Sequence, residues 1–207
     1  GALDAISSGD ASAGVKEALA KGADYAVSSL GKSGGFMGND KVKIKLPGYL
    51  EKADSALRMF GMGKQADQLV ETMNRAAENA VAEAKPSLTE SIKKMSVKDA
   101  KDILTGGEDS VTQYFKRTST DQLTAKFKPV VKKETAKLKL ADQYNKFAGK
   151  AASAGLVDKQ NADVDSYVTQ KAMDGLFLMI AEEEKKLRAN PMGAGSDLLK
   201  NVFGALN

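Results

Sequence analysis

Residues 166–188 read SYVTQKAMDGLFLMIAEEEKKLR, and this stretch decides the fold. Its middle, Leu176–Ala181, is apolar on every side of a helix, and such a helix must lie inside a protein. Six apolar residues are too few to cross a bilayer, which takes about 20. We therefore expect a buried central helix against which the other helices pack.

The two ends of this helix carry start and stop signals. Asp163 or Asp165 can cap its first turn, because a short carboxylate accepts hydrogen bonds from the free N–H groups there. Pro191 ends it, since the residue before a proline is pushed out of the helical conformation. Gly175 costs about 1 kcal/mol relative to alanine in a helix interior. We therefore predict that a second helix crosses closely at Gly175.

The composition is that of an ordinary globular protein rich in helices. Of the 207 residues, 42% are hydrophobic and 28% charged, and only four are proline. We predict an all-α fold, a compact multi-helix bundle around the buried helix 166–188. It forms a single α-helical domain over residues 10–207, after a loose N-terminal segment at residues 1–9. Within it, Val42 and Ile44 alternate with lysines, which predicts one short extended arm or hairpin near 41–46.

Spacing along the chain predicts further helix boundaries. Capping-box spacings indicate helix starts at Ser87, Ser96 and Ser119, each followed three residues later by an acid or glutamine. Glu184 and Arg188 stand four residues apart, a spacing that allows an ion pair on a helix. Additional helices are predicted at about 48–60, 141–153 and 197–206.

The residues that the chain lacks exclude several classes of site. Without His and Cys it can form no Ser-His-Asp or Cys-His nucleophile, no His/Cys zinc site and no disulfide. A GKS tripeptide at 31–33 suggests a phosphate loop, but that motif needs a glycine where the chain has Ala26 within a helical pattern. We expect no cofactor, and we favour a protein without catalytic activity.

A polar cluster on two predicted helices is the first candidate ligand-binding site. It consists of Glu71, Asn74, Arg75, Glu78, Asp174 and Glu182. Carboxylate and amide oxygens could hold a hard cation, and the arginine could hold an anion. The structural alternative is an interhelical salt-bridge network in which Arg75 pairs with Asp174 or Glu182. We favour the network, because no spacing matches an established metal loop.

A lysine-rich stretch is the second candidate, as a surface for an anionic partner. We call it the lysine face, and it consists of Lys126, Lys128, Lys132, Lys133 and Lys137. It could bind phosphates of lipid headgroups, lipopolysaccharide or nucleic acid, or it could be a solvated helix face. Nucleic acid is disfavoured, because Phe127, the one interleaved aromatic residue, belongs to the inner face. The net charge of +4 is also too mild to indicate nucleic acid.

Five segments, taken in order, resemble one bacterial family. They are VKEALAKGADYAVSSLGKSGGF, MNRAAENAVAEAKP, AKDILTGGEDSVTQYFKRTS, LTAKFKPVVKK and DGLFLMIAEEEKKLRANP. Together they are similar to the family called domain of unknown function 4197, over about Val15–Phe203. Members of that family typically carry an N-terminal export signal, sometimes of lipoprotein type. The resemblance implies a periplasmic or envelope-attached protein, and it brings no catalytic residues.

Two functional hypotheses follow. The first is a non-enzymatic periplasmic or envelope binding or scaffolding protein, without a transmembrane segment and associated peripherally with the envelope. Its partner would be a protein, a lipid or a small anionic ligand. The second is a metal-dependent hydrolase or metal-binding protein that uses the polar cluster.

Overall fold

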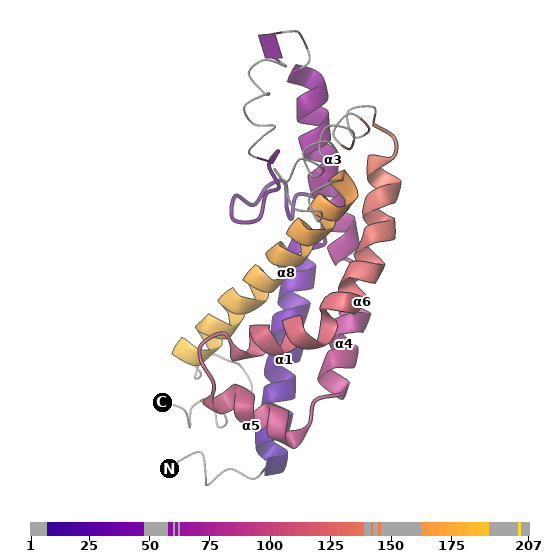
Figure 1. The fold of residues 1–207 in the computed structure, drawn as a ribbon. Helices are drawn as coiled ribbons and strands as arrows, with labels where there is room; N and C mark the ends of the chain where they lie inside the picture. The colour runs from indigo at the N-terminus through magenta and orange to yellow at the C-terminus, as the bar shows by residue number, and fades with distance from the viewer. Residues whose placement is uncertain are drawn as a thin grey trace, which may run out of the picture. The chain divides into compact units, whose positions relative to one another are not determined.

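The structure is a computed structural model that describes residues 8–47, 58–59, 61, 63–138, 142, 145, 163–190 and 203. These residues form helices and irregular segments but no strand, so the all-α prediction is confirmed (Figure 1). The helices are α1 (Ser8–Leu30), α3 (Gly63–Val81), α4 (Lys85–Lys93), α5 (Val97–Thr105), α6 (Ser110–Thr135) and α8 (Val164–Ala189). The helices predicted at 48–60, 141–153 and 197–206 lie almost wholly outside the described residues.

The chain divides into two compact units, which we describe separately. Unit 1 comprises Gly1–Ser28, Ala84–Leu123 and Leu176–Asn207, and unit 2 comprises Ser29–Glu83 and Thr124–Gly175. Three of the four unit boundaries fall within α1, α6 and α8, so each of these helices contributes residues to both units, and the fourth lies between α3 and α4. The single domain over residues 10–207 stays a prediction.

The core of unit 1 is built from the apolar stripes of five helices. Fully buried side chains come from α1, α4, α5, α6 and α8, and they include Leu19, Leu88, Leu104, Phe115 and Ile180. Leu178 is an exception to the prediction that Leu176–Ala181 is buried on every side, because 40% of it is exposed. The helix therefore keeps one solvent-facing side even where its sequence is apolar all round.

The core of unit 2 is organised by the small-residue stripe of α3. Leu69, Met73, Ala76 and Ala80 recur at helical spacing, and all are buried. Buried side chains of the other elements complete this core, namely Phe36, Ile44, Phe127, Val131, Val168 and Ala172.

None of the helices in the described residues is both long enough and apolar enough to span a membrane.

Of the predicted helix starts, two are confirmed and two are wrong. Asp163 accepts a hydrogen bond from the Ser166 N–H at 2.7 Å just before α8, and the Ser96–Asp99 capping box is formed at α5. The start at Ser87 is wrong, because α4 begins at Lys85 with its proline in the first turn. The start at Ser119 is also wrong, because α6 continues through it and its hydroxyl donates to the Phe115 carbonyl. A serine can bond backward within a helix as well as cap one.

The helix crossing predicted at Gly175 is wrong, although the close approach that motivated it is present. A Cβ atom at this position would lie 2.8 Å from Cε2 and 3.0 Å from Cζ of Phe36. Phe36 is fully buried and belongs to the glycine-rich loop of unit 2, residues 31–38, not to a helix. The glycine makes room for a loop side chain.

Replacing Gly175 and Gly22 by alanine should have opposite effects on stability. Both glycines lie inside helices, where alanine is favoured by about 1 kcal/mol. At Gly22 the nearest atom to an added Cβ is 4.0 Å away, so Gly22→Ala should stabilise the protein by up to about 1 kcal/mol. Gly175→Ala must displace Phe36 and should destabilise by about 1–3 kcal/mol. Urea unfolding measures both, and equal stabilisation by the two changes would contradict the packing described.

Candidate functional site

The glycine-rich loop of unit 2 is held by one buried carboxylate. Glu78 of α3 accepts hydrogen bonds from the backbone N–H groups of Gly34 at 3.1 Å, Phe36 at 3.0 Å and Met37 at 3.0 Å. Gly34 has a φ of +83°, a conformation that favours glycine, and it helps to turn the N–H groups toward one point. Convergent backbone N–H groups form a concavity that binds anions. Here the anion is the protein's own glutamate.

One turn earlier on α3, Asn74 holds the arm that follows the loop. Its Oδ1 accepts from the Ile44 N–H at 2.8 Å, and its Nδ2 donates to the Ile44 carbonyl at 2.9 Å. The amide thus bonds the arm as a neighbouring strand would, and the described residues contain no strand that forms a hairpin with it. Val42 and Ile44 are buried whereas Lys41 and Lys45 are exposed, which confirms the alternation read from the sequence.

The other members of the polar cluster do not join Asn74 and Glu78. Arg75 pairs with Glu71 at 2.7 Å on the surface of α3, and its side chain is 62% exposed. The predicted buried pairing of Arg75 with Asp174 or Glu182 is therefore wrong, since Arg75 points to solvent. Asp174 accepts a hydrogen bond from Gln170 at 2.9 Å, and Glu182 belongs to unit 1. The described residues contain no group of three or more acidic side chains placed to hold a metal ion.

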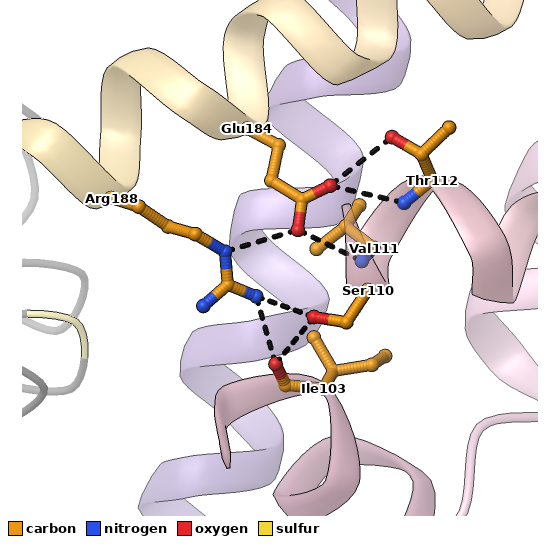
Figure 2. A network of polar contacts seen from close by, with 6 residues as sticks. All are labelled: Ile103, Ser110, Val111, Thr112, Glu184 and Arg188. Carbon is orange, nitrogen blue, oxygen red and sulfur yellow. Dashed lines mark hydrogen bonds and ion pairs between the residues drawn. The ribbon is translucent and has the colours of Figure 1, made fainter. Parts of the chain in front are cut away.

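Unit 1 contains a second buried carboxylate, Glu184 of α8, shown in Figure 2. One oxygen accepts from the Val111 N–H at 2.9 Å, and the other accepts from the N–H and the hydroxyl of Thr112, both at 3.1 Å (Figure 2). These N–H groups belong to the first turn of α6, where the helix offers them no partner of its own. The negative charge also lies at the positive end of the helix dipole. Glu184 therefore caps α6 from another helix.

Arg188 completes this network and extends it to α5. Its Nε donates to Glu184 at 3.0 Å, so the predicted i,i+4 pair is confirmed. Its Nη2 donates to the Ile103 carbonyl at 2.8 Å and to the Ser110 hydroxyl at 2.7 Å (Figure 2). The Glu184 side chain is 1% exposed and that of Arg188 13%. The spacing of the pair predicted the bond, but it could not show that the pair is buried or that it joins α5 to α6.

The start of α5 is likewise explained by structural hydrogen bonds. The Ser96 N–H donates to Asp99 and lowers the pKa of this carboxyl, and the nearby charge of Arg117 lowers it further. Burial raises the pKa of the Tyr114 hydroxyl, which donates to the Ser91 carbonyl at 2.6 Å. These groups line a hollow of about 390 Å³. Because the capping box accounts for the Asp99 shift and burial accounts for the Tyr114 shift, we assign no site to this hollow.

The lysine face is solvent-exposed, as predicted, with four of its lysines on α6 and Lys137 in the turn that follows. All five lysines are exposed, whereas Phe127 and Val131 between them are fully buried. Glu134, the acid within the stretch, accepts a hydrogen bond from Asn79 of α3 at 3.1 Å. Within the part of the chain that the structure describes, no carboxylate forms an ion pair with any of the five lysines. Of the two sequence-predicted sites, the lysine face is the one whose charged groups remain available.

Glu78→Gln should loosen the glycine-rich loop. The amide keeps one acceptor but turns an NH₂ group toward backbone N–H donors, so at least one of the three loop N–H groups loses its partner. Such a loss costs about 1–3 kcal/mol. Urea unfolding should show that cost, and hydrogen exchange should accelerate at one or more of the Gly34, Phe36 and Met37 amides. Glu71→Gln on the exposed side of α3 is the control and should stay within about 0.5 kcal/mol. Unchanged exchange at all three amides would contradict the role of Glu78 in holding the loop.

Glu184→Ala should be far more destabilising than removal of an exposed pair with the same spacing. It leaves Arg188 and two N–H groups of α6 without their buried acceptor, and breaking a buried pair costs about 3–5 kcal/mol. The matched control is Glu90→Ala, because Glu90 pairs with Lys94 four residues later on the surface of α4. Exposed pairs contribute about 0–1 kcal/mol. Chemical unfolding compares the two, and equal losses would contradict the role of Glu184.

Comparison with known proteins identifies the family. Residues 5–204 match the family model described as "Protein of unknown function (DUF4197)". Neither the search of curated proteins nor the search of solved structures gave a match. The resemblance noted in the five sequence segments is thereby confirmed. Because the match spans nearly the whole chain, the protein belongs to the DUF4197 family.

Proposed function

We propose that this protein is a non-enzymatic binding protein of the bacterial periplasm or envelope, and that its lysine face holds an anionic partner. The observation that supports this most directly is that the five lysines are exposed and form no ion pair with a described carboxylate. They are exposed on one segment of unit 2, and no carboxylate of the described residues neutralises them. A partner with several negative charges would be attracted by all five lysines at once and would bind more tightly.

The alternative, a metal-dependent hydrolase, is less well supported by the polar cluster. A metal or a general base needs carboxylate oxygens that can face a ligand. Both oxygens of Glu78 accept backbone hydrogen bonds, and both polar atoms of the Asn74 amide bond the arm. The buried members of the cluster thus serve the loop and the arm, and the exposed Arg75 and Glu71 pair with each other.

The proposed location depends on the family resemblance. Members of the family typically carry an export signal, which favours the periplasm or the envelope. Scaffolding and binding remain alternatives within this proposal, since one charged surface can serve either.

The binding role can be tested with a charge-matched pair of variants on an immobilised polyanion such as heparin. Wild-type protein should be retained at low salt and released as salt rises, because exposed charges are screened over about 8 Å at physiological ionic strength. Lys132→Glu with Lys133→Glu should elute at clearly lower salt. Lys93→Glu with Lys101→Glu changes the net charge equally at exposed positions of α4 and α5 and should elute close to wild type.

Both variants should melt within a few degrees of the wild type, because all four lysines are exposed and a charge in the last turn of a helix contributes only about 0.3–1 kcal/mol. Equal elution of the two variants would show that net charge, rather than the lysine face, governs retention. No retention of the wild type at low salt would contradict the proposed function.

A further inference from the structure

The lysine face has a two-row arrangement that its sequence does not make obvious. With 3.6 residues per turn, Lys126 and Lys133 fall along one side of α6, and Lys128 and Lys132 along another, while Lys137 follows in the turn after the helix. Between the rows lie the small uncharged residues Ala125 and Pro129. Ala136 continues this strip just past the end of α6, where its N–H still donates to the Lys132 carbonyl at 3.0 Å, and all three residues are exposed. Since a helix with side chains is about 10–12 Å wide, the two rows flank a narrow, smooth ridge.

None of the three residues of this strip has a large apolar side chain that would insert into the acyl region of a bilayer. The large apolar side chains that are exposed in the described residues are Tyr25, Met37, Met59, Val97 and Leu178, and none of them lies on α6. A helix that enters the acyl region of a bilayer uses large apolar or aromatic residues on its buried side. The lysine face can therefore reach charged headgroups but has no apolar anchor among the described residues of α6.

The same face is poorly suited to reading nucleic acid. A helix in the major groove presents its central ridge to base edges, which are recognised through polar side chains. Here the ridge is Ala125, Pro129 and Ala136. Single strands are held by stacking on aromatic side chains, and Phe127 is fully buried. The cations are all lysines, which act as point charges, whereas arginine provides the bidentate fork that suits fixed phosphate positions.

The charge of the chain is concentrated in the unit that bears this face. Unit 2 contains 18 lysine and arginine residues against 13 acidic ones, whereas unit 1 contains 13 against 14, which together give the chain's 31 and 27. The basic excess therefore belongs to unit 2, which an anionic surface would attract more strongly than unit 1.

From these observations we infer that the lysine face docks flat on an anionic phospholipid surface, with lysines of both rows contacting headgroup phosphates and no side chain entering the acyl layer. This inference rests on the proposed function and names its partner. Lipid headgroups can move laterally to meet the lysines, so no fixed phosphate spacing is required. Each lysine near such a surface strengthens binding about fivefold, and the attraction decays within a Debye length.

Vesicle sedimentation tests the lipid partner. The protein should pellet with vesicles of phosphatidylglycerol and phosphatidylcholine, stay in solution with pure phosphatidylcholine, and be released by salt. One variant per row, Lys126→Glu with Lys133→Glu and Lys128→Glu with Lys132→Glu, should each bind at least about 25-fold more weakly. The control Lys93→Glu with Lys101→Glu should bind within a few-fold of wild type. A loss confined to one row would overturn the two-row contact.

A single fluorescent label tests the depth of contact. Because the chain has no cysteine, Ala125→Cys provides a unique attachment point between the two rows. Energy transfer to headgroup-labelled lipid should appear on binding, whereas lipids brominated near the bilayer centre should not quench the label. Deep quenching would overturn the peripheral mode.

A parallel arm with short duplex and single-stranded DNA separates this inference from the proposed function. Retention on heparin and binding to DNA, without binding to anionic vesicles, would overturn the lipid partner and leave an anionic binding role in place. Failure on heparin, DNA and vesicles alike would overturn both.

Discussion

Buried backbone N–H groups must find acceptors, and in each unit a glutamate side chain from a helix supplies them. In unit 2 Glu78 accepts three N–H groups of the glycine-rich loop, and in unit 1 Glu184 accepts two at the start of α6. An unpaired buried donor costs about 1–3 kcal/mol, a large part of the 5–15 kcal/mol by which folded domains are stable. Each glutamate thereby holds a segment distant in sequence, the loop in one unit and the α5–α6 connection in the other.

This use of carboxylates bears directly on function. A buried glutamate next to an asparagine invites a catalytic or metal-binding interpretation, yet the oxygens of Glu78 and the amide of Asn74 are occupied by the protein's own backbone. What stays available for a partner is the exposed charge on α6. The buried carboxylates therefore stabilise the fold, whereas the exposed lysines can bind a partner. Buried charges must be paired, but an exposed lysine loses little stability by remaining unpaired.

Packing around Gly175 shows how the loop is integrated with the helices of unit 2. The ring of Phe36 occupies the space that a side chain at Gly175 would take, while the backbone of the same residue is bonded by Glu78. One residue of the loop is thus held from α8 by packing and from α3 by a hydrogen bond. Asn74 then holds the arm that follows, so the loop and the arm are attached to α3 only four residues apart.

The sequence by itself determined what local chemistry controls. It predicted the all-α class, the caps at Ser96 and Asp163, the alternation of the arm and the exposed lysine face. These depend on periodicity or on neighbours within four residues. Only the tertiary structure decided that Phe36 faces Gly175, that Glu78 holds a loop some 42 residues away, and that Glu184 caps a helix about 72 residues away. Such partners cannot be read from spacing, because a carboxylate can pair with a lysine, a metal or a backbone N–H, and the fold decides which of them comes within reach.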